Sequence, residues 1–512
     1  MSNRGYSPAI GAAVLSVLAC AHRSLASDVT ATNVLTERAI VAVALARNPT
    51  LAATVGDLRR AQLLEQAEEH RYSFVLGLDT SATRARSPNL GFTGVTVPES
   101  TTYSGGVELS RHTVYGTDLK LRLEGSSQRT QSTFVDAAAT PPSMLTFTVG
   151  PGYGTSAKLS LTQPLLRGAG RDVYYAELDA ARANSVSARN AHDQAASQLL
   201  LDVLTSYWEI NYASRSVEIQ LRSLELAKAQ RDETAQRVST GSVAPVDVLS
   251  FETSIATIEE DLASARAEER KQIAELARLI GDPGLNLNSS ADTTSPMPEP
   301  EPPAADVKDR TLGVSYELAQ QRALVDLATV QARTAEESYR PKLDLDAYVQ
   351  AQGLGNRSLG PMFDQLGGLG AVSAHVGLTY QAALDGTQQR SERERALVAI
   401  QIAKQRLTAI EQRLVTDVDK ALTREESSRK RVKLADATLA IAKQQYEAEA
   451  QRFRTGSATA LQVREAENSV RSAELRASRA RADWIEASLT LEHLSGRLLE
   501  RWTKVDLSEA RY

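Results

Sequence analysis

The stretch that decides the fold is "RFRTGSATALQVREAE", residues 452–467. A charged run of helical composition ends at Thr-Gly-Ser, a short break follows, and a second helical run begins. An earlier stretch, "RVSTGSVAPVDVLSFE" at residues 237–252, has the same layout. Glycine readily adopts the left-handed conformation that ends helices, so each stretch predicts a sharp corner between two helices.

The corner belongs to a longer internal repeat. Gly241 and Gly456 lie 215 positions apart (456 minus 241), and this offset holds without a gap from Gln236/Gln451 to Gly281/Gly496. About a third of the aligned positions are identical, more than two unrelated helices should share. The alternative, two independent coiled-coil helices of convergent composition, does not explain the shared Thr-Gly-Ser.

We therefore expect two structural repeats, residues 28–281 and 313–498. A proline-rich linker at 282–312 joins them, because "SSADTTSPMPEPEPPAADVKD" is rich in proline, serine and acid. Residues 499–512 form a C-terminal tail.

Each repeat has the same predicted order of elements. In the first, a helix interrupted at Asn48-Pro49 precedes strands within about 73–163, where apolar and polar residues alternate. A long helix at 171–240 follows, since that range contains neither proline nor glycine. A closing helix at 245–281 begins with Pro245, which suits a first helical turn.

The second repeat has an opening helix, strands within about 342–381, a long helix at 388–454 and a closing helix at 460–495. Thr459 and Gln462 have capping-box spacing at the start of the closing helix. Apolar residues at heptad spacing give the long helix a narrow coiled-coil seam; they are Ile400, Ala403, Leu407, Ile410, Leu414 and Ala421.

The strands alternate as lipid-facing barrel strands do. Unpaired strand edges cost several kcal/mol per polar group in lipid, so a membrane sheet must close into a barrel of about eight strands or more. One chain offers four strands, or six if the hairpin 107–123 joins the sheet. Several copies should therefore close one barrel; the alternative is a soluble sheet packed on helices.

The composition and the N-terminal sequence limit the classes of function that the protein can have. The 512 residues carry a net charge of -5 and 5% aromatic residues, which gives no reason to expect nucleic acid as a partner. Residues 1–27 have the pattern of a secretory signal peptide, the alternative being a disordered apolar tail. "VLAC" resembles a lipoprotein box, so Cys20 is either acylated or an ordinary cysteine of a removed segment. No later run is long enough for a membrane helix.

Catalytic motifs are missing from the sequence. There is no HExxH, no GxSxG and no histidine pair at ligand spacing, and "GPGYGTSAK" lacks the glycine that precedes the lysine of a phosphate loop. We therefore expect no enzyme activity, no cofactor and no metal.

The chain resembles the TolC-like outer-membrane efflux family. The resemblance rests on the two glycine corners, the duplicated layout and "SLTQPLLRGAG" at the passage from strand to helix, which contains Pro164 and Gly168. Pro341 marks the passage from helix to strand in the second half. The resemblance covers nearly all of residues 35–498.

The resemblance implies a fold that is mainly α with β, a homotrimer in which four strands per chain build a twelve-stranded barrel in outer-membrane lipid. The long helices would form a periplasmic α-helical barrel. The protein would then be the exit duct of a tripartite efflux pump or a type I secretion system. Its partners would be a periplasmic adaptor (membrane fusion) protein and, through it, an inner-membrane RND or ABC transporter. The alternative function is a periplasmic coiled-coil scaffold or adaptor without a pore.

The resemblance also implies roles for the corners, which would form the periplasmic tip where the adaptor docks. The docking turns are Thr240, Gly241, Ser242, Thr455, Gly456 and Ser457. The residues that would form the aperture are Asp247, Phe453, Gln462 and Glu465. Ala458 replaces the basic residue that would pair with the acid past the first corner. Glu465 could instead be a solvated charge, and Asp247 could simply stabilise the start of its helix.

Overall fold

The computed structural model describes residues 37–91, 94–96, 98–136, 143–241, 244–282 and 307–502. The predictions for the signal segment with Cys20, for Ser242, for most of the linker and for residues 503–512 lie outside the described residues. Two compact units are present. One contains Met1–Arg59, Ser187–Arg322 and Gln405–Tyr512, and the other contains Arg60–Val186 and Ala323–Lys404, so each unit draws on both halves of the sequence.

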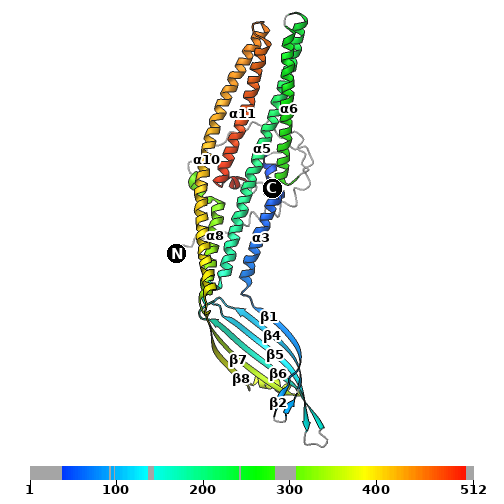
Figure 1. Cartoon of the computed structure of the whole chain (residues 1–512), viewed down its shortest axis with the longest axis vertical. Helices are drawn as coiled ribbons and strands as arrows, with labels where there is room; N and C mark the ends of the chain where they lie inside the picture. The colour runs from blue at the N-terminus through cyan, green and yellow to red at the C-terminus, as the bar shows by residue number, and fades with distance from the viewer. Residues whose placement is uncertain are drawn as a thin grey trace, which may run out of the picture. The chain divides into compact units, whose positions relative to one another are not determined.

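In the first half of the chain, helices both precede and follow the strands in the sequence (Figure 1). They are α2 (Glu37–Arg47), α3 (Pro49–His70), α4 (Arg171–Tyr174), α5 (Ala176–Ser239) and α6 (Pro245–Ile280). The break at Asn48-Pro49 is confirmed. The predicted long helix differs at its start, where α4 stops before α5. The Tyr72 hydroxyl donates to the Tyr174 carbonyl at 3.0 Å, and the two rings lie 4.4 Å apart, which explains the local break.

The second half contains α7 (Val307–Val314), α8 (Tyr316–Tyr339), α10 (Thr387–Arg454) and α11 (Ala460–Leu494). Of the predicted heptad positions in α10, Ala403, Leu414 and Ala421 are buried, which confirms the seam. The main apolar cluster of the helical unit is larger than such thin seams suggest: Ile40, Leu200, Leu204 and Ile280 are each at most 2% exposed.

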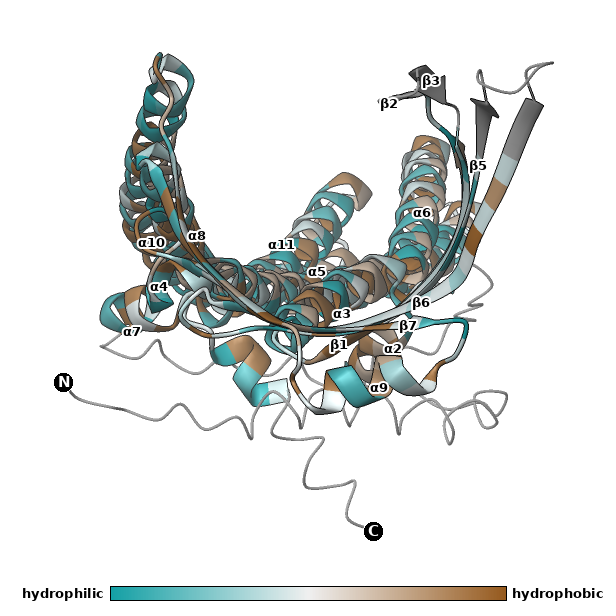
Figure 2. Cartoon of the chain, turned by 90° about the horizontal axis from the view of Figure 1, so that it is seen from below, coloured by the Kyte–Doolittle hydropathy of each residue, from teal (hydrophilic) through white to brown (hydrophobic). Residues whose placement is uncertain are grey.

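The sheet has six antiparallel strands in the order β1-β4-β5-β6-β7-β8. Their bounds are β1 Val75–Arg86, β4 Glu99–His112, β5 Asp118–Asp136, β6 Ser143–Pro164, β7 Lys342–Asn356 and β8 Val372–Gln381. A separate two-stranded ribbon pairs β2 (Asn89–Gly91) with β3 (Gly94–Thr96). The sheet is curved (Figure 2).

Of the two strand counts that the sequence left open, the structure confirms six, because the hairpin joins the sheet as β4 and β5. The four strands per chain that the family resemblance implied are exceeded. The turn at Gly116, with φ +83°, connects these two strands. Both strands continue far beyond the hairpin 107–123 through polar, serine- and glycine-rich sequence, in which apolar alternation is lost. The hydrogen-bonded pairing is continuous there, with Ser104 opposite Ser126.

A short helix, α9 (Gly360–Gly367), lies in the connection between β7 and β8 and was not predicted. It packs on the convex side of the sheet (Figure 2). Gly353 and Gly355 of β7 make this possible, because a Cβ atom on either one would clash with the backbone at Met362 or Ser358. Alternate residues of β7 that share the face of these glycines therefore point to the convex side.

Among the described helices, none by itself is long and apolar enough to cross a membrane. The bent pair α2 and α3 reaches the required length and composition when its two members are taken together.

Candidate functional site

The first corner ends α5 at a glycine in the left-handed region, as predicted. Gly241 has φ +72°, and its N–H donates to the Val238 carbonyl at 2.9 Å. The Thr240 hydroxyl donates to the carbonyl of Arg237 at 2.9 Å. Pro245 occupies the first turn of α6, which confirms the predicted helix start. These bonds satisfy backbone groups that a helix end leaves without partners.

The second corner is closed by several side-chain and backbone hydrogen bonds. Gly456 has φ +76°, and the Ser457 N–H and hydroxyl both donate to the Arg452 carbonyl, at 2.8 and 3.0 Å. Thr459 and Gln462 form the predicted capping box: the Gln462 side-chain oxygen accepts from the Thr459 N–H at 2.8 Å. The Gln462 carboxamide is thus engaged by its own helix.

The two corners contact each other through a residue that sequence reasoning missed. The guanidinium of Arg237, at the end of α5, lies 5.0 Å from the ring centre of Phe453 and donates to the Phe453 carbonyl at 3.4 Å. The only sequence feature that pointed to Arg237 is the arginine at the matched position of the second repeat, Arg452. An aromatic face attracts such a cation, so Arg237 links the two corners within one chain.

The acidic aperture candidates lie close to the corners. Asp247 is half-buried in the first turn of α6, where its N–H donates to the Ala244 carbonyl at 3.1 Å. Glu465 is exposed on the second turn of α11. Within the part of the chain that the structure describes, neither carboxylate has an ion-pair partner. Ala458 supplies no cation, so the expected closing link has no basic member at that position.

Glu467 was not singled out from the sequence, although it is the most perturbed acid near the corners. Its side chain on α11 is 6% exposed, and within the described residues its Oε1 has no hydrogen-bond partner. Burial raises the pKa of Glu467 to about 7, and the neighbouring Arg471 opposes that rise. Burial also raises the pKa of Tyr446 on α10, with a further contribution from the charge of Glu467. Glu252, its counterpart in the first repeat, is exposed.

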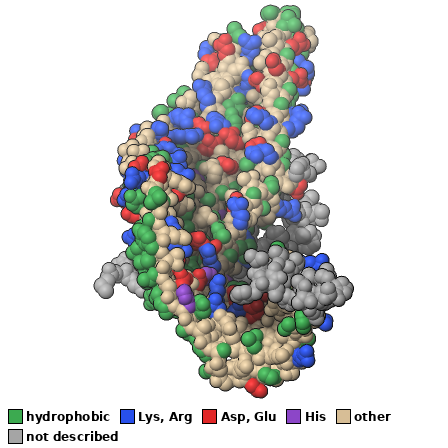
Figure 3. Space-filling model, turned by 60° about the horizontal axis from the view of Figure 1, so that its bottom comes forward, with side chains coloured by type: hydrophobic (Ala, Val, Ile, Leu, Met, Phe, Trp, Pro, Cys, Tyr) green, Lys and Arg blue, Asp and Glu red, His purple; other side chains and the backbone are tan. Residues whose placement is uncertain are grey.

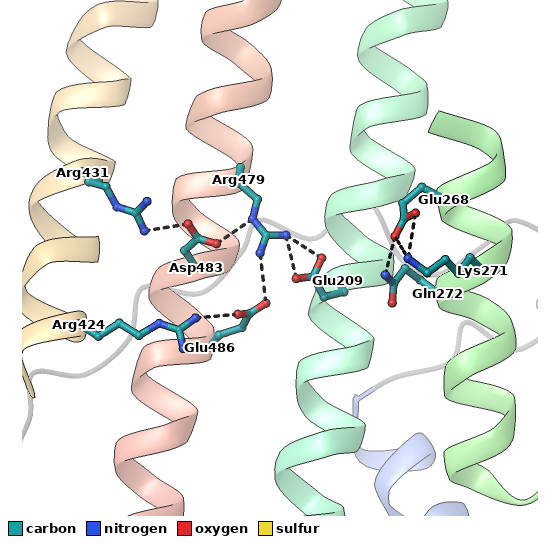
Figure 4. A network of polar contacts seen from close by, with 9 residues as sticks. All are labelled: Glu209, Glu268, Lys271, Gln272, Arg424, Arg431, Arg479, Asp483 and Glu486. Atoms are coloured by element: carbon teal, nitrogen blue, oxygen red, sulfur yellow. Dashed lines mark hydrogen bonds and ion pairs between the residues drawn. The ribbon is translucent and has the colours of Figure 1, made fainter. Parts of the chain in front are cut away.

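Further along α11, a charge network ties this helix to both long helices (Figure 4). The Arg479 guanidinium bonds Glu209 of α5 at 2.8 Å and Asp483 at 2.7 Å. From α10, Arg431 reaches Asp483 at 2.8 Å, and Arg424 reaches Glu486 at 3.3 Å. Burial and the charge of Glu209 raise the pKa of Glu486. The network fixes α11 between α5 and α10.

In the sheet, one face carries an apolar band that crosses all six strands. Strand pairing aligns two rows of residues across the sheet. The rows are Leu78, Val107, Leu123, Ala157, Ala351, Val372 and Leu76, Leu109, Leu121, Leu159, Val349, Ala374. Val349 and Ala351 share the face of the glycines under α9, so the apolar band lies on the convex side. Most of its side chains are exposed, as Leu78 is at 75%, whereas Ala351 is buried.

The opposite, concave face is polar. The row between the two apolar rows contains Gly77, Glu108, Arg122, Lys158, Gln350 and Ser373. Arg122 pairs with Asp79 at 2.9 Å and with Glu124 at 3.1 Å. Charged side chains are visible in the hollow of the sheet in the space-filling view (Figure 3).

The predicted junction residues lie where strands meet helices. Pro164 is the last residue of β6, and Pro341 immediately precedes β7. The two passages are bonded together, since the N–H of Leu165 donates to the Leu343 carbonyl at 2.7 Å. Gly168 has φ +86°, and a Cβ atom on Gly116 would clash with the Gly168 carbonyl. The junction thus also supports the turn between β4 and β5.

Comparison with known proteins identifies the family. The family described as "Outer membrane efflux protein" matches residues 40–282 and 308–497. The chain belongs to this family. It is an outer-membrane protein with a large periplasmic portion.

Individual relatives are distant. The chain is 22% identical to outer membrane protein TolC of Escherichia coli (strain K12) over 307 residues, which cover 59% of this chain and 62% of TolC. Among solved structures, the outer membrane protein VceC of Vibrio cholerae is 17% identical with a TM-score of 0.62, covering 90% of this chain and 96% of VceC. The MtrE channel of Neisseria gonorrhoeae is 18% identical with a TM-score of 0.61, covering 90% and 89%. These structures share the fold.

Proposed function

We propose that the protein is the outer-membrane exit duct of a tripartite efflux pump or a type I secretion system, working as a homotrimer. The observation that carries the proposal is the sheet with an exposed apolar band on its convex face and charges on its concave face. A curved sheet of this kind is suited to a barrel wall, with lipid outside and water inside. A periplasmic scaffold without a pore would not contact lipid, so it gives no reason for an exposed apolar band.

The helix corners give the duct its docking end. Helices α5, α6, α10 and α11 would line the periplasmic part, and a periplasmic adaptor would contact the turns around Gly241 and Gly456. The adaptor would connect the duct to an inner-membrane RND or ABC transporter. Transport energy would come from that transporter, because we expect the duct itself to have no catalytic activity.

Channel recording in planar lipid bilayers tests the proposal. We expect discrete conductance steps from the purified protein. The double variant Asp247→Ala/Glu465→Ala should give larger or more frequent steps, because removal of the aperture charges should make the channel open more easily. Cell fractionation is the companion test, in which the protein should require detergent for extraction. Absence of conductance from both proteins, together with extraction by salt alone, would favour the scaffold.

A further inference from the structure

Two strands of the sheet, β4 and β5, exceed the four-strand plan that the family resemblance implied. They are inserted between β1 and β6, with 14 and 19 residues. Either they belong to the membrane wall, or they form a polar extension outside it. The two possibilities predict different side chains where these strands cross the level of the apolar band.

The inserted strands carry the band without a break. Val107 and Leu109 of β4 are paired with Leu123 and Leu121 of β5, and these continue the rows formed by β1 and β6. Leu121 is 41% and Leu123 50% exposed on the convex face. Four apolar side chains at this level, open to solvent, match lipid better than water.

The concave side of the same two strands carries matched charges. Arg122 of β5 lies between Glu108 of β4 and Lys158 of β6 in the strand pairing, and it also contacts Asp79 of β1. A row of charges that alternates with the apolar rows is the pattern of a wall between lipid and water. The insertion therefore has both faces of a membrane-spanning hairpin.

The sheet has two edges, β1 and β8, neither of which has a second neighbour among the described strands. Their unpaired backbone groups would be costly in lipid. Because six strands alternate in direction, β1 and β8 run antiparallel to each other. The edge β1 of one copy can therefore pair with β8 of the next, and this head-to-tail contact closes into a ring. The band continues onto both edges, through Leu76 on β1 and Val376 on β8.

We propose that all six strands of each chain cross the lipid and that three copies close an eighteen-stranded barrel through β1–β8 pairing. The copy number rests on the homotrimer of the proposed function; the occupant of each edge is a second copy of this chain. Barrels of about 16–18 strands hold an aqueous channel. The membrane part of this duct would thus be wider than a twelve-stranded barrel.

The test is quenching of tryptophan fluorescence by brominated phosphatidylcholine in vesicles containing the full-length protein. Leu121→Trp and Val107→Trp report on the insertion, and Val349→Trp on β7 lies in the same row as Leu121 and marks the depth. Lys120→Trp, on the other face of β5, is the matched control. The wild-type protein supplies the background of the native tryptophans, and native mass spectrometry of each variant gives the number of copies.

We expect Leu121→Trp and Val107→Trp to be quenched as strongly as Val349→Trp, Lys120→Trp to be protected, and the assembly to contain three copies. Quenching of Val349→Trp without quenching of either insertion reporter would overturn the eighteen-stranded barrel and leave the exit duct standing. An assembly of two copies would also overturn it. If Val349→Trp is not quenched either, the sheet does not span lipid, and the proposed function falls as well.

Discussion

Among the acids near the two helix corners, the buried carboxyl of Glu467 has the environment that disfavours its charged form most. A charged carboxylate loses hydration when it is buried, and a single nearby cation, Arg471, offsets this only partly. The neutral form is therefore favoured in the folded protein well above the ordinary pKa of 4.5.

This environment predicts that stability falls as pH rises. In the unfolded chain Glu467 releases its proton near pH 4.5, whereas in the folded protein it keeps the proton until about pH 7. The folded state is thus penalised progressively between these values, by up to roughly 3 kcal/mol above pH 7. Glu467→Gln, which stays neutral, should raise the thermal unfolding midpoint at pH 8 and leave it unchanged at pH 4.

Circular dichroism of the detergent-solubilised protein at the two pH values measures this effect. Glu252→Gln is the control, because Glu252 occupies the matched position in the first repeat and is exposed. Equal midpoints for wild type and Glu467→Gln at pH 8 would show that Glu467 is already hydrated or paired.

Glu467 and Glu252 also show the limit of sequence reasoning at this scale. The two are equivalent in the repeat, and the corner glycines beside them were predicted with their left-handed conformation. Burial of one glutamate and exposure of the other depend on which helices pack against each face. Neither periodicity nor spacing contains that information, so Glu467 and the Arg237–Phe453 contact were missed.

At the scale of elements, the corners were predictable because glycine, proline and capping residues act locally. The strands were harder: β4 and β5 are apolar only near one end and become polar beyond Gly125 and Gly105. Their pairing is decided by neighbouring strands, whose alignment a single sequence does not reveal. Helix α9 was also not predictable, because it packs on Gly353 and Gly355 of β7 and this packing surface exists only once the sheet has formed.

The proposed docking role of the corner at Gly456 can be tested with two substitutions, one that adds a large side chain and one that changes only the backbone preference. A Cβ atom built there has no atom within 4 Å beyond its chain neighbours, so the backbone cost of a left-handed non-glycine residue, on the order of 1 kcal/mol, is the main cost expected for Gly456→Trp. We expect it to assemble normally but to abolish dye efflux from cells in which it is the only outer-membrane duct, because the ring would occupy the docking surface. Gly456→Ala carries the same backbone cost without the bulk and should retain efflux. Normal efflux with Gly456→Trp would place docking elsewhere.

At the scale of the whole molecule, one chain has the features that we propose for one part of a barrel wall. The apolar band on its sheet is largely exposed and suits contact with lipid. The charged side chains of the sheet face its hollow, and the edge strands β1 and β8 lack second neighbours among the described strands. Composition and alternation led to the prediction that several copies close one barrel, and this stays a prediction. The number of strands that each copy contributes was not predictable, because it depends on the pairing of the inserted hairpin.

Electron cryomicroscopy of the full-length protein in lipid nanodiscs tests this account most directly. We predict a closed ring of strands built by three chains, in which β1 of each chain is hydrogen-bonded to β8 of its neighbour and the apolar band faces the lipid. A particle in which one chain stands alone, with the apolar band packed against its own helices, would contradict it.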